Sequence, residues 1–468
     1  MSGNAFDLNV QQVLEHWSAA SALRELIANA LDEAMLSKTS PPDIIYEPAS
    51  RTVRIRDYGR GLRHEHLTQN ESSEKLSHPK TVIGKFGVGL KDALAVFDRH
   101  GISVSIFSRH ENMLLARYPK HGFPDITTLH VLVEPPSKPK FEGTEIILSP
   151  IAETALEEAK SLFLQWAGDQ VLERTSVGAV LRRSDDGPAR IYVNGLLVAT
   201  EDEFLFSYDI TSLTAALRKA LNRERTNVGR TAYSERVKAI LLATQSEEVA
   251  QSLADDLSNY QEGTMHVETG WNEVGLHAVG ILNAQGQKLF VTPEQVANSP
   301  ELIGRAKNDG YDIVIVPPTL IDRFGTITDT NGNPIVDSVV WTEQWLESFV
   351  FEFVDRSDLT TRERKGFDKL DKVMKLVGGQ PSNVEAVKIS DSLRTDYPGA
   401  PDSYGGVWLS DKSLIVIRRD QLQSIEMFAG TLLHELVHAI GGAHDQSIDF
   451  EVELTALIGE LAANVISN

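Results

Sequence analysis

The sequence predicts an α+β protein of several domains, on the grounds of its length, its composition and its pattern of apolar residues. The chain has 468 residues, and at roughly 100–200 residues per domain this length corresponds to two to four domains. Hydrophobic residues make up 41% and charged residues 24%, so each domain can bury a core of its own. Stretches with a helical apolar period and stretches with strand alternation follow one another along the chain.

The first region, residues 1–150, is predicted to form two helices and then a set of strands. The helices are expected over 10–17 and 21–36, and a further helix begins after Gly89. The expected strands cover 44–47, 52–57, 103–109, 114–118, 130–133 and 144–148. This pattern indicates a domain that combines a sheet with helices.

Three further regions follow. Residues 151–265 are expected to form a second α/β domain, in which Asn194-Gly195 between two strands is a strong hairpin signal. Residues 266–340 show a small β-α-β pattern, and residues 341–468 are expected to be mainly helical, with a short strand over 414–418. The expected helices of these regions cover 152–165, 213–221, 232–244, 293–309 and 343–377.

Charge and cysteine content restrict the chemistry of the chain. It has 45 Lys and Arg against 66 Asp and Glu, which gives a net charge of −21. This charge argues against loose binding to nucleic acid or to an anionic membrane, because affinity for phosphate comes mainly from Lys and Arg. The absence of cysteine excludes disulfides, thiol nucleophiles and cysteine-ligated metal centres. Any metal must therefore be held by His, Asp, Glu or Asn.

The sequence gives no sign of export or membrane insertion. Residues 1–20 have neither a basic start nor an apolar stretch. No segment approaches the roughly 20 apolar residues of a membrane span, since the apolar segment 454–466 is interrupted by Glu460. We therefore expect a soluble, cytoplasmic protein without a membrane partner.

A polar face on one predicted helix is the first functional signal. Glu25, Asn29 and Asp32 are spaced i, i+4 and i+7, which places them on one face of the helix over 21–36. The residues around them are apolar, and a buried polar group without a partner costs roughly a few kcal/mol. A bound magnesium nucleotide would supply that partner, whereas the alternative is an ordinary amphipathic helix.

Glycine-rich motifs follow in order along the chain. Asp57-Tyr-Gly59-Arg-Gly61 comes directly after a strand, Gly84-Lys85-Phe86-Gly87-Val88-Gly89 opens a helix, and Gly143-Thr144 begins a later strand. Glycine lets the backbone approach phosphate oxygens closely, and the N-terminus of a helix favours negative charge. Each motif alone is a weak signal, but ordinary glycine turns rarely coincide in this order.

Together these motifs resemble those of the GHKL ATPases, which include DNA gyrase B, the ninety-kilodalton heat-shock chaperones, MutL, the MORC proteins and the histidine kinases. The resemblance covers about the first 150 residues and extends to about residue 260 if a second domain belongs to it. It implies a Bergerat-type α/β sandwich that binds ATP and magnesium. The presence of Glu25 favours hydrolysis over the phosphotransfer of histidine kinases.

The resemblance also implies roles for individual residues. Glu25 would be the general base for the attacking water, and Asn29 would coordinate magnesium. Asp57 would accept a hydrogen bond from the adenine amino group, with Thr144 beside it. The glycines of the second motif would lie under the phosphates, and Lys91 would reach one of them. The further residues of the implied ATP site are Asp32, Gly59, Gly61, Gly84, Lys85, Gly87 and Gly89.

In gyrase-like and chaperone-like members, a second domain supplies a basic residue to the terminal phosphate. Arg223, Arg225 and Arg230 are the candidates in this chain, because guanidinium groups match the geometry of phosphate oxygens. The alternative is a solvated charge cluster at the end of a helix.

The second functional signal is His434-Glu435-Leu-Val-His438 within an apolar stretch. On a helix, the i, i+4 spacing directs both imidazoles to one place, and Glu435 flanks it. This HExxH pattern supplies two zinc ligands and a carboxylate that activates the attacking water; the alternative is a pair of core histidines. The strand over 414–418 lies where zincin peptidases place the edge strand that binds the substrate backbone.

The third zinc ligand is open among four residues. His444 would complete the metzincin pattern HExxHxxGxxH, but metzincins need a methionine turn after the motif and the last methionine, Met427, precedes it. A glutamate on the next helix is the alternative, and Glu451 is favoured because its surroundings resemble bacterial zincin-like domains. Glu453 and Asp445 are the remaining candidates, and Asp445 could instead orient a ligand histidine.

The two sites together predict an ATP-binding and ATP-hydrolysing protein whose nucleotide state regulates a zinc-dependent peptidase. Its partners would be a protein or peptide substrate and, by family resemblance, a second copy of the chain in an ATP-dependent homodimer. A role as a stress or phage-defence effector is a hypothesis from architecture alone. The alternative is an ATP-driven, MORC-like clamp or chaperone with a non-proteolytic zincin-like domain. Nucleic acid is not expected as a partner.

Overall fold

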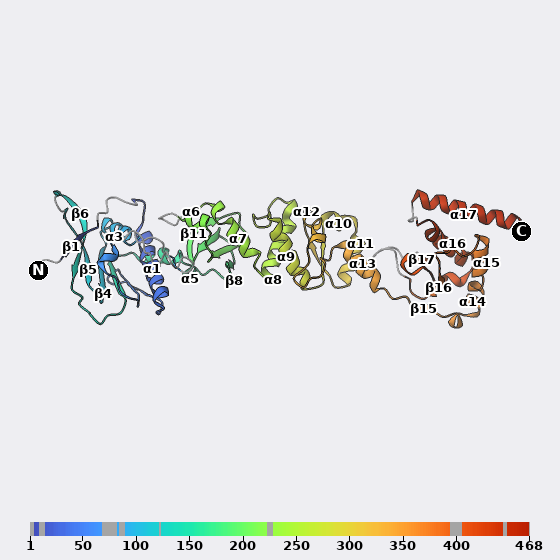
Figure 1. Cartoon of the computed structure of the whole chain (residues 1–468), viewed down its shortest axis with the longest axis horizontal. Helices are drawn as coiled ribbons and strands as arrows, with labels where there is room; N and C mark the ends of the chain where they lie inside the picture. The colour runs from blue at the N-terminus through green and yellow to red at the C-terminus, as the bar shows by residue number, and fades with distance from the viewer. Residues whose placement is uncertain are drawn as a thin grey trace. The chain divides into compact units, whose positions relative to one another are not determined.

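A computed structural model of the chain describes residues 4–8, 15–67, 82–83, 89–120, 123–221, 228–393, 405–442 and 447–467 (Figure 1). The chain divides into two compact units, Met1–Ile281 and Leu282–Asn468. Within the described residues, each unit contains two sheets with helices packed against them. The prediction of a multidomain protein that mixes helices and sheets is therefore confirmed.

The first unit begins with an antiparallel sheet. Its strands, in the order in which they pair, are β1 (Asn4–Asp7), β6 (Phe123–Glu134), β5 (Asn112–Lys120), β4 (Ser103–Ser108), β7 (Thr144–Ser149), β3 (Thr52–Arg56) and β2 (Asp43–Glu47). Neighbouring strands run antiparallel throughout. The sequence did not predict β1, and β6 begins at Phe123 rather than at residue 130.

Helix α1 (Ala19–Ser37) supplies much of the core of this sheet. The Ser18 side chain caps the helix by accepting a hydrogen bond from the Ser21 N–H at 3.2 Å. Helix α1 packs against α3 (Gly89–Arg99) and α4 (Glu153–Ser161). One continuous core joins Leu23, Leu26 and Ile27 of α1 to Val53 and Ile55 of β3 and Phe97 of α3.

Of the two helices that the sequence predicts at the start of the chain, the structure confirms the second. The helix over 21–36 is confirmed as α1. Residues 15–16 form a turn instead of a helix, and residues 10–14 lie outside the described part of the chain.

A second sheet in the same unit has the order β11-β10-β12-β9-β8. Its strands are β8 (Val171–Arg174), β9 (Gly178–Leu181), β10 (Ala189–Val193), β11 (Leu196–Glu201) and β12 (Ser207–Ile210). The predicted hairpin joins β10 to β11, and both Asn194 and Gly195 have positive φ (50° and 77°), as a tight two-residue hairpin requires. The helices of this part are α5 (Leu164–Ala167), α6 (Ala215–Ala220), α7 (Ser234–Leu241) and α8 (Glu247–Ser258), and α9 (Asn272–Ala284) contains the boundary between the two units.

The link between the two sheets explains why the predicted helix over 152–165 is divided. It breaks into α4 and α5 at 162–163 because the backbone there bonds to the hairpin instead of continuing the helix. The Leu164 N–H donates to the Gly195 carbonyl and the Leu197 N–H donates to the Leu162 carbonyl, both at 2.8 Å. These two hydrogen bonds fix the β10–β11 hairpin to the segment between α4 and α5.

The second unit begins with a small parallel pair, β13 (Lys288–Val291) and β14 (Asp312–Ile315). The predicted helix over 293–309 is divided into α10 (Pro293–Asn298) and α11 (Pro300–Asn308), since Pro300 cannot donate a helical hydrogen bond. Leu289, Val291, Ile303 and Trp341 form the core. The neighbouring helices are α12 (Pro318–Ile321) and α13 (Ser338–Ser348).

The remaining residues of the second unit form helices around a mixed sheet of order β15-β16-β18-β17. The strands are β15 (Phe353–Val354), β16 (Ala386–Ser390), β17 (Gly406–Leu409) and β18 (Leu414–Arg418). The helices are α14 (Thr361–Phe367), α15 (Leu370–Leu376), α16 (Ile425–Gly441) and α17 (Ile448–Ser467). The strand predicted over 414–418 exists as β18, but it is not an edge strand, because it pairs on one side with β16 and on the other with β17.

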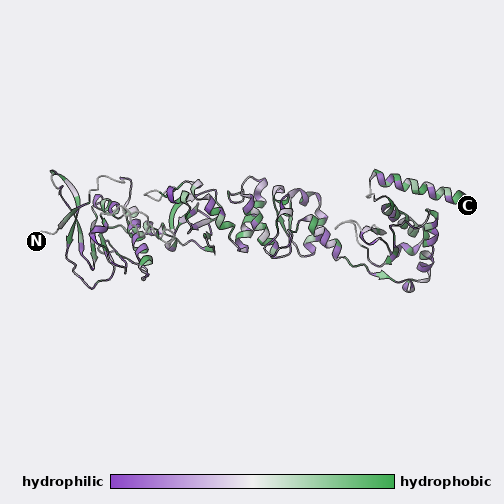
Figure 2. Cartoon of the chain, in the orientation of Figure 1, coloured by the Kyte–Doolittle hydropathy of each residue, from purple (hydrophilic) through white to green (hydrophobic). Residues whose placement is uncertain are grey.

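One face of helix α17 packs against α16, and the opposite face carries exposed apolar residues. Phe450 and Leu457 pack toward α16, whereas Ile448, Val452 and Ile466 are exposed. Figure 2 shows hydrophilic and hydrophobic residues alternating along this helix. Across the described residues, no helix is both long enough and apolar enough to cross a membrane.

Candidate functional sites

Helix α1 carries the predicted polar face into the interior of the first unit. Glu25 and Asp32 are buried, with 3% and 0% of their surface exposed, and Asn29 is partly exposed. The Ile83 N–H donates a hydrogen bond to the Asp32 carboxylate. The i, i+4, i+7 spacing thus places two buried carboxylates and one amide along a single face, as the sequence predicted.

Two features of the structure position the Glu25 carboxylate. The Arg24 guanidinium forms a buried ion pair with Glu25, with Nη2 at 2.9 Å from Oε1, and it lies over the ring of Trp17 at 5.2 Å. Helix α3 begins against the same carboxylate, since a Cβ on Gly89 would lie 2.4 Å from Glu25 Oε2. Sequence reasoning missed Arg24, although an arginine directly before the proposed base was visible.

Asp57 lies at the end of β3 in a turn that the neighbouring strand β7 completes. Its Oδ1 accepts hydrogen bonds from the Gly59 N–H at 2.9 Å and from the Thr144 N–H at 3.2 Å. Burial raises the pKa of Asp57, although these donors act in the opposite direction. The Thr144 hydroxyl accepts from the Leu62 N–H at 3.0 Å. The structure therefore brings Asp57, Gly59 and Thr144 together, as predicted.

Gly143 is required by the close approach of two backbone segments in this turn. Its φ is +82°, and an added Cβ would lie 1.8 Å from the Asp57 carbonyl oxygen. Gly61 also has a positive φ, +87°, and lies beside the Gly143 carbonyl. The Gly-Thr motif and the Asp-Gly motif thus form one continuous structural element.

Glu33 is a further acidic residue at this place that the sequence reasoning did not select. Its carboxylate accepts hydrogen bonds from the Arg60 backbone N–H and side chain at 2.8–3.0 Å, and from the Ser37 hydroxyl at 2.7 Å. Burial alone would raise the pKa of Glu33, but Arg60 and Ser37 lower it to about 2. An added Cβ on Gly59 would lie 2.4 Å from this carboxylate, so Glu33 also explains the first glycine of the Asp-Gly motif.

Part of the predicted nucleotide site lies outside the described residues. This holds for Gly84, Lys85 and Gly87, and for Arg223 and Arg225. Gly89 and Lys91 lie in the first turn of α3.

Arg230, the third candidate for a phosphate contact, is engaged elsewhere. Its guanidinium pairs with Glu201 and Glu203, both at 2.5 Å. These hydrogen bonds, from Glu201 first, raise the pKa of Arg230 above its usual value. In this structure the Arg230 side chain is therefore bound to carboxylates at and just after β11 of the second sheet.

The second sheet contacts the segment that leads into the glycine-rich motif. The Asn194 side-chain amide, at the tip of the β10–β11 hairpin, donates to the Val82 carbonyl at 2.9 Å. The next residue along the chain, Ile83, donates to Asp32. One short segment is thus held by both the hairpin and helix α1.

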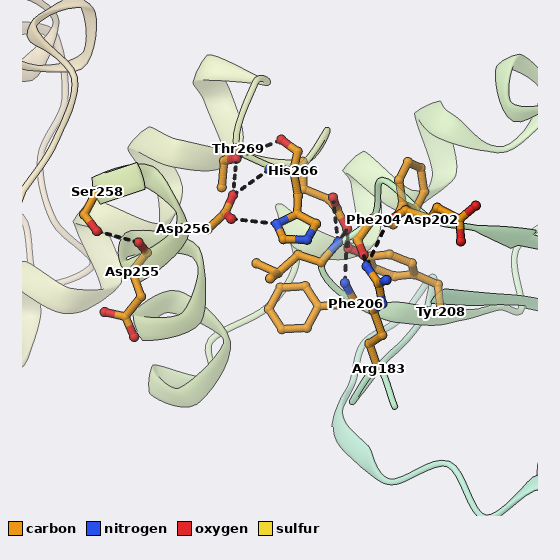
Figure 3. A network of polar contacts seen from close by, with 12 residues as sticks. Arg183, Asp202, Phe204, Phe206, Tyr208, Asp255, Asp256, Ser258, His266 and Thr269 are labelled. Atoms are coloured by element: carbon orange, nitrogen blue, oxygen red, sulfur yellow. Dashed lines mark hydrogen bonds and ion pairs between the residues drawn. The ribbon is translucent and has the colours of Figure 1, made fainter. Parts of the chain in front are cut away.

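A buried carboxylate anchors the second sheet to the segment after α8. Glu268 is fully buried and accepts hydrogen bonds from the Leu205 N–H and the Tyr208 hydroxyl, each at 2.9 Å. Burial raises the pKa of Glu268. Arg183 donates to the carbonyls of Asp202 and Phe204, and so fixes the loop before β12 (Figure 3).

A second carboxylate, Asp256 at the end of α8, holds the same segment from the other side. It accepts hydrogen bonds from His266 Nδ1 at 2.6 Å and from the Thr269 hydroxyl at 2.5 Å (Figure 3). Asp256 and Glu268 together give this part of the first unit a buried polar framework that ties α8 to β12.

Helix α16 brings His434, Glu435 and His438 together in the second unit. The two Nε2 atoms of the histidines lie 3.3 Å apart. Phe450 of α17 packs on both rings, with centroid distances of 4.8 and 4.7 Å. Glu435 is buried with 4% of its surface exposed, and Gly406 at the start of the edge strand β17 lies against it. The strand beside the HExxH motif is therefore β17.

The candidates for a third ligand differ in their placement on α17. Glu451 is exposed, because Phe450 and Leu457 occupy the packed face of the helix. Glu453 instead turns toward α16, where an added Cβ on Gly441 would lie 1.5 Å from its Oε2, and this oxygen is buried without a hydrogen bond. His444 and Asp445 lie outside the described residues. In the described part of the chain, no group of three or more His, Asp or Glu side chains is placed to hold a metal ion.

Fold and sites define a multidomain α/β protein with a buried carboxylate cluster on α1 and a histidine pair on α16. A family model described as the Mycoplasma pneumoniae MPN635 N-terminal domain matches residues 154–247, which hold the second sheet. An uncharacterized protein of Mycoplasma pneumoniae is 41% identical over 239 residues, which are 50% of this chain and 95% of that protein. The chain belongs to the same family as that protein. Another uncharacterized protein of this organism is 24% identical over 351 residues, 69% of this chain and 96% of that protein.

The close approach at Gly143 predicts a large loss of stability on adding one methyl group. Gly143→Ala would combine an unfavourable φ with a backbone clash, and should lower the free energy of unfolding by about 2–4 kcal/mol. Gly101→Ala is the matched control, since Gly101 has a φ of +68° but nothing within 4 Å of an added Cβ. Urea unfolding of both variants measures the difference. Equal losses would show that the contact with Asp57 is unimportant.

The low pKa of Glu33 predicts a pH-dependent contribution to stability. The pKa falls from 4.5 in the unfolded chain to about 2 in the folded one, so the ionised carboxylate stabilises the fold above pH 4.5 and this stabilisation is lost as the pH falls toward 2. Glu33→Gln should therefore destabilise the protein at pH 7, and the difference from wild type should shrink progressively below pH 4.5. Unfolding of the two proteins across this range, with the exposed Glu262→Gln as control, measures the effect. A difference that is constant with pH contradicts it.

Proposed function

We propose that the chain binds and hydrolyses ATP in its first unit and that the nucleotide state regulates a zinc-dependent peptidase in its second unit. One observation carries the proposal: a single chain brings together a buried carboxylate face beside glycine turns and an HExxH helix with converging imidazoles. Either alone would suggest one activity, and their combination suggests regulation of one by the other.

The nucleotide half rests on the arrangement around α1. The antiparallel sheet, with α1 and α3 packed on it, supports a Bergerat-type ATP-binding fold. Asp57 would accept from the adenine amino group, and its backbone donors leave the second carboxylate oxygen for that purpose. Asn29 would hold magnesium, which would neutralise phosphate charge when bound. The start of α3 at Gly89 would face the phosphates.

Glu25 would act as the general base for the attacking water. The buried ion pair with Arg24 holds its carboxylate in place, where it would accept the proton of the attacking water. Arg24 acts in this scheme as a positioning residue. Arg223 and Arg225 remain the candidates for the terminal phosphate, since Arg230 is paired with Glu201 and Glu203.

The metal half rests on the distance between the two histidines. Two nitrogens bound at roughly 2.0–2.1 Å to one tetrahedral zinc ion lie about 3.3 Å apart, and the observed Nε2–Nε2 distance is 3.3 Å. His434 and His438 would therefore hold the ion. Zinc would supply Lewis acidity and make water more acidic when bound. Glu435, buried beside β17, would accept the proton from the attacking water while the edge of β17 aligns a peptide backbone.

Glu453 is our choice for the third ligand, in place of Glu451, and its carboxylate would have to move toward the two histidines, since the three side chains do not form a metal-holding group as they are placed in the described residues. Its Oε2 is a buried oxygen without a hydrogen bond, and it lies against Gly441, one turn beyond His438. A buried carboxylate oxygen without a partner is costly, and a metal ion would remove that cost.

Substrates would be proteins or peptides, and ATP would promote a homodimer of the chain. A cytoplasmic location agrees with the absence of cysteine. A clamp or chaperone without proteolysis is the second candidate, because Phe450 packs on both histidine rings, as it would on a structural pair of core histidines. A stress or phage-defence effector remains our hypothesis for the biological role.

For the nucleotide half, Glu25→Gln should retain ATP binding and lose hydrolysis. Removing a general base typically lowers the rate about 10²–10⁴-fold, while the amide keeps the shape of the site. Phosphate release and binding of a fluorescent ATP analogue measure the two steps, with Glu262→Gln as the control. Unchanged turnover in Glu25→Gln would rule out its assignment as the base.

For the metal half, purified protein should contain zinc, and His438→Ala should lose it. Glu453→Gln should lower the zinc content, whereas Glu451→Gln, two residues away on the exposed face, should not. Glu435→Gln should keep zinc and cleave a casein-like substrate at least about 10²-fold more slowly. Metal analysis and cleavage assays with and without ATP test these outcomes. Zinc loss in Glu451→Gln alone would reverse the ligand assignment, and equal cleavage by wild type and Glu435→Gln would exclude the peptidase.

A further inference from the structure

A pocket of about 500 Å³ lies in the second unit at the opposite end of α16 from the end that carries the histidines. Helices α14 and α15 form one wall, and residues 422–425, which lead into the first turn of α16, form the other. His434 lies nine positions after Ile425 in the sequence, which corresponds to about 14 Å along the helix axis. The pocket is therefore distinct from the HExxH site, and one of its lining residues, Ile425, is the first residue of the helix that carries the motif.

The rim of the pocket is strongly basic in an otherwise acidic chain. Arg362, Lys365, Lys369 and Lys372 all line it: the first two lie on α14, Lys369 lies in the turn between the helices, and Lys372 lies on α15. All four are exposed. Within the described residues none of them takes part in an ion pair. Against the net charge of −21, this is a local positive patch.

Two of the acidic neighbours are already paired with arginines, and the third, Asp371 of α15, is exposed and does not line the pocket. Glu363 is occupied by Arg419, with the closest atoms 3.1 Å apart, and Asp368 is occupied by Arg356 at 2.6 Å. Glu363 has its pKa lowered to about 2 by the Arg419 side chain first and the Thr360 N–H second. It is therefore ionised and already paired. The four rim cations remain available to an external anion.

The floor of the pocket is apolar. Val373 and Leu422 are buried, while Leu376 and Ile425 are partly open to the pocket. The lining contains neither an aromatic nor an acidic side chain among the described residues. An apolar floor within a basic rim matches a ligand that has a bulky apolar group between negative charges.

We propose that this pocket docks an acidic polypeptide segment that lays one bulky apolar side chain on the floor of the pocket, against the more open side chains of Leu376 and Ile425. Carboxylates on either side of that residue would meet Lys365, Lys369 and Lys372. Single-stranded nucleic acid fits less well, because its bases bind by stacking on aromatic rings and the lining offers none. A simple phosphate ion would leave the apolar floor uncovered.

A role of this pocket in selecting substrates rests on the proposed peptidase function. The binding of an acidic segment to the pocket does not. Captured beside the N-terminus of the helix that also carries Glu435, an acidic substrate would have a high effective concentration at the HExxH site. Exposed charges of this kind contribute mainly to encounter and orientation, so binding should weaken with added salt.

Binding of labelled peptides to the full chain, followed by fluorescence anisotropy, tests the docking site. The probe has a leucine flanked on each side by glutamates. One comparison peptide replaces the leucine with serine, another replaces the glutamates with lysines, and an oligodeoxynucleotide of equal charge is the third. The first probe should bind at least tenfold more tightly than the others. Absence of binding, or tighter binding of the oligonucleotide, overturns the proposal.

Charge reversal locates the binding to the pocket. The double variant Lys369→Glu with Lys372→Glu should weaken binding of the first probe at least tenfold. The control, Lys375→Glu with Lys412→Glu, changes the same net charge at exposed positions of α15 and the β17–β18 turn that do not line the pocket. Equal weakening by both pairs would mean non-specific attraction and would overturn the assignment.

Cleavage assays separate this proposal from the proposed function. In an active peptidase, the Lys369→Glu/Lys372→Glu variant should raise the KM of a substrate with the acidic segment at least tenfold and leave its kcat unchanged. A lowered kcat would contradict the exosite. If the wild type cleaves nothing but still binds the peptide through these lysines, the docking site stands and the peptidase function fails.

Discussion

Helix α1 carries ionisable side chains into the interior of the first unit, and the energetic cost of that burial constrains the segments around it. An isolated buried carboxylate is strongly disfavoured unless donors or cations meet it. Glu25 is met by Arg24, Asp32 by the Ile83 N–H, and Glu33 by Arg60. The turn after β3, the start of α3 and the segment before it are all placed so that they satisfy this one helical face.

The glycines of the first unit follow from the same constraint. Backbone and carboxylates approach so closely that a Cβ at Gly59 or Gly89 would overlap Glu33 or Glu25, and one at Gly143 would overlap the Asp57 carbonyl. Helix α16 repeats the arrangement in the second unit, where Gly406 makes room for Glu435 and Gly441 makes room for Glu453. In both units, residues that look like flexible turns in the sequence are sites of tight packing.

Sequence patterns predicted local elements well and non-local ones poorly. Helix α1, strand β18 and the hairpin at Asn194 were predicted because their signals lie within a few residues. Strand β1 was missed because its pairing with β6 joins segments more than 100 residues apart in sequence, such as Phe6 with Val131. The edge position of β17 and the division of the helix over 152–165 depend likewise on distant partners.

The candidate sites show the same division. Glu25 and the HExxH residues were selected from their spacing and Asp57 from its glycine motif, whereas Glu33 and the orientation of Glu453 depend on which side of a helix meets a neighbour. The local pattern favoured Glu451 over Glu453, whereas the orientation of the two side chains is decided by the packing of Phe450 and Leu457 on α16.

The hydrogen bonds of Val82 and Ile83 have a mechanical consequence. The Val82 carbonyl, bound by Asn194, and the Ile83 N–H, bound by Asp32, belong to one peptide group. A peptide group is planar and rigid, so it cannot turn toward one partner without straining its bond to the other. The hairpin of the second sheet and the carboxylate of α1 therefore bind opposite sides of one rigid peptide group, directly before the glycine-rich motif. A movement of either partner would change the orientation of this peptide group.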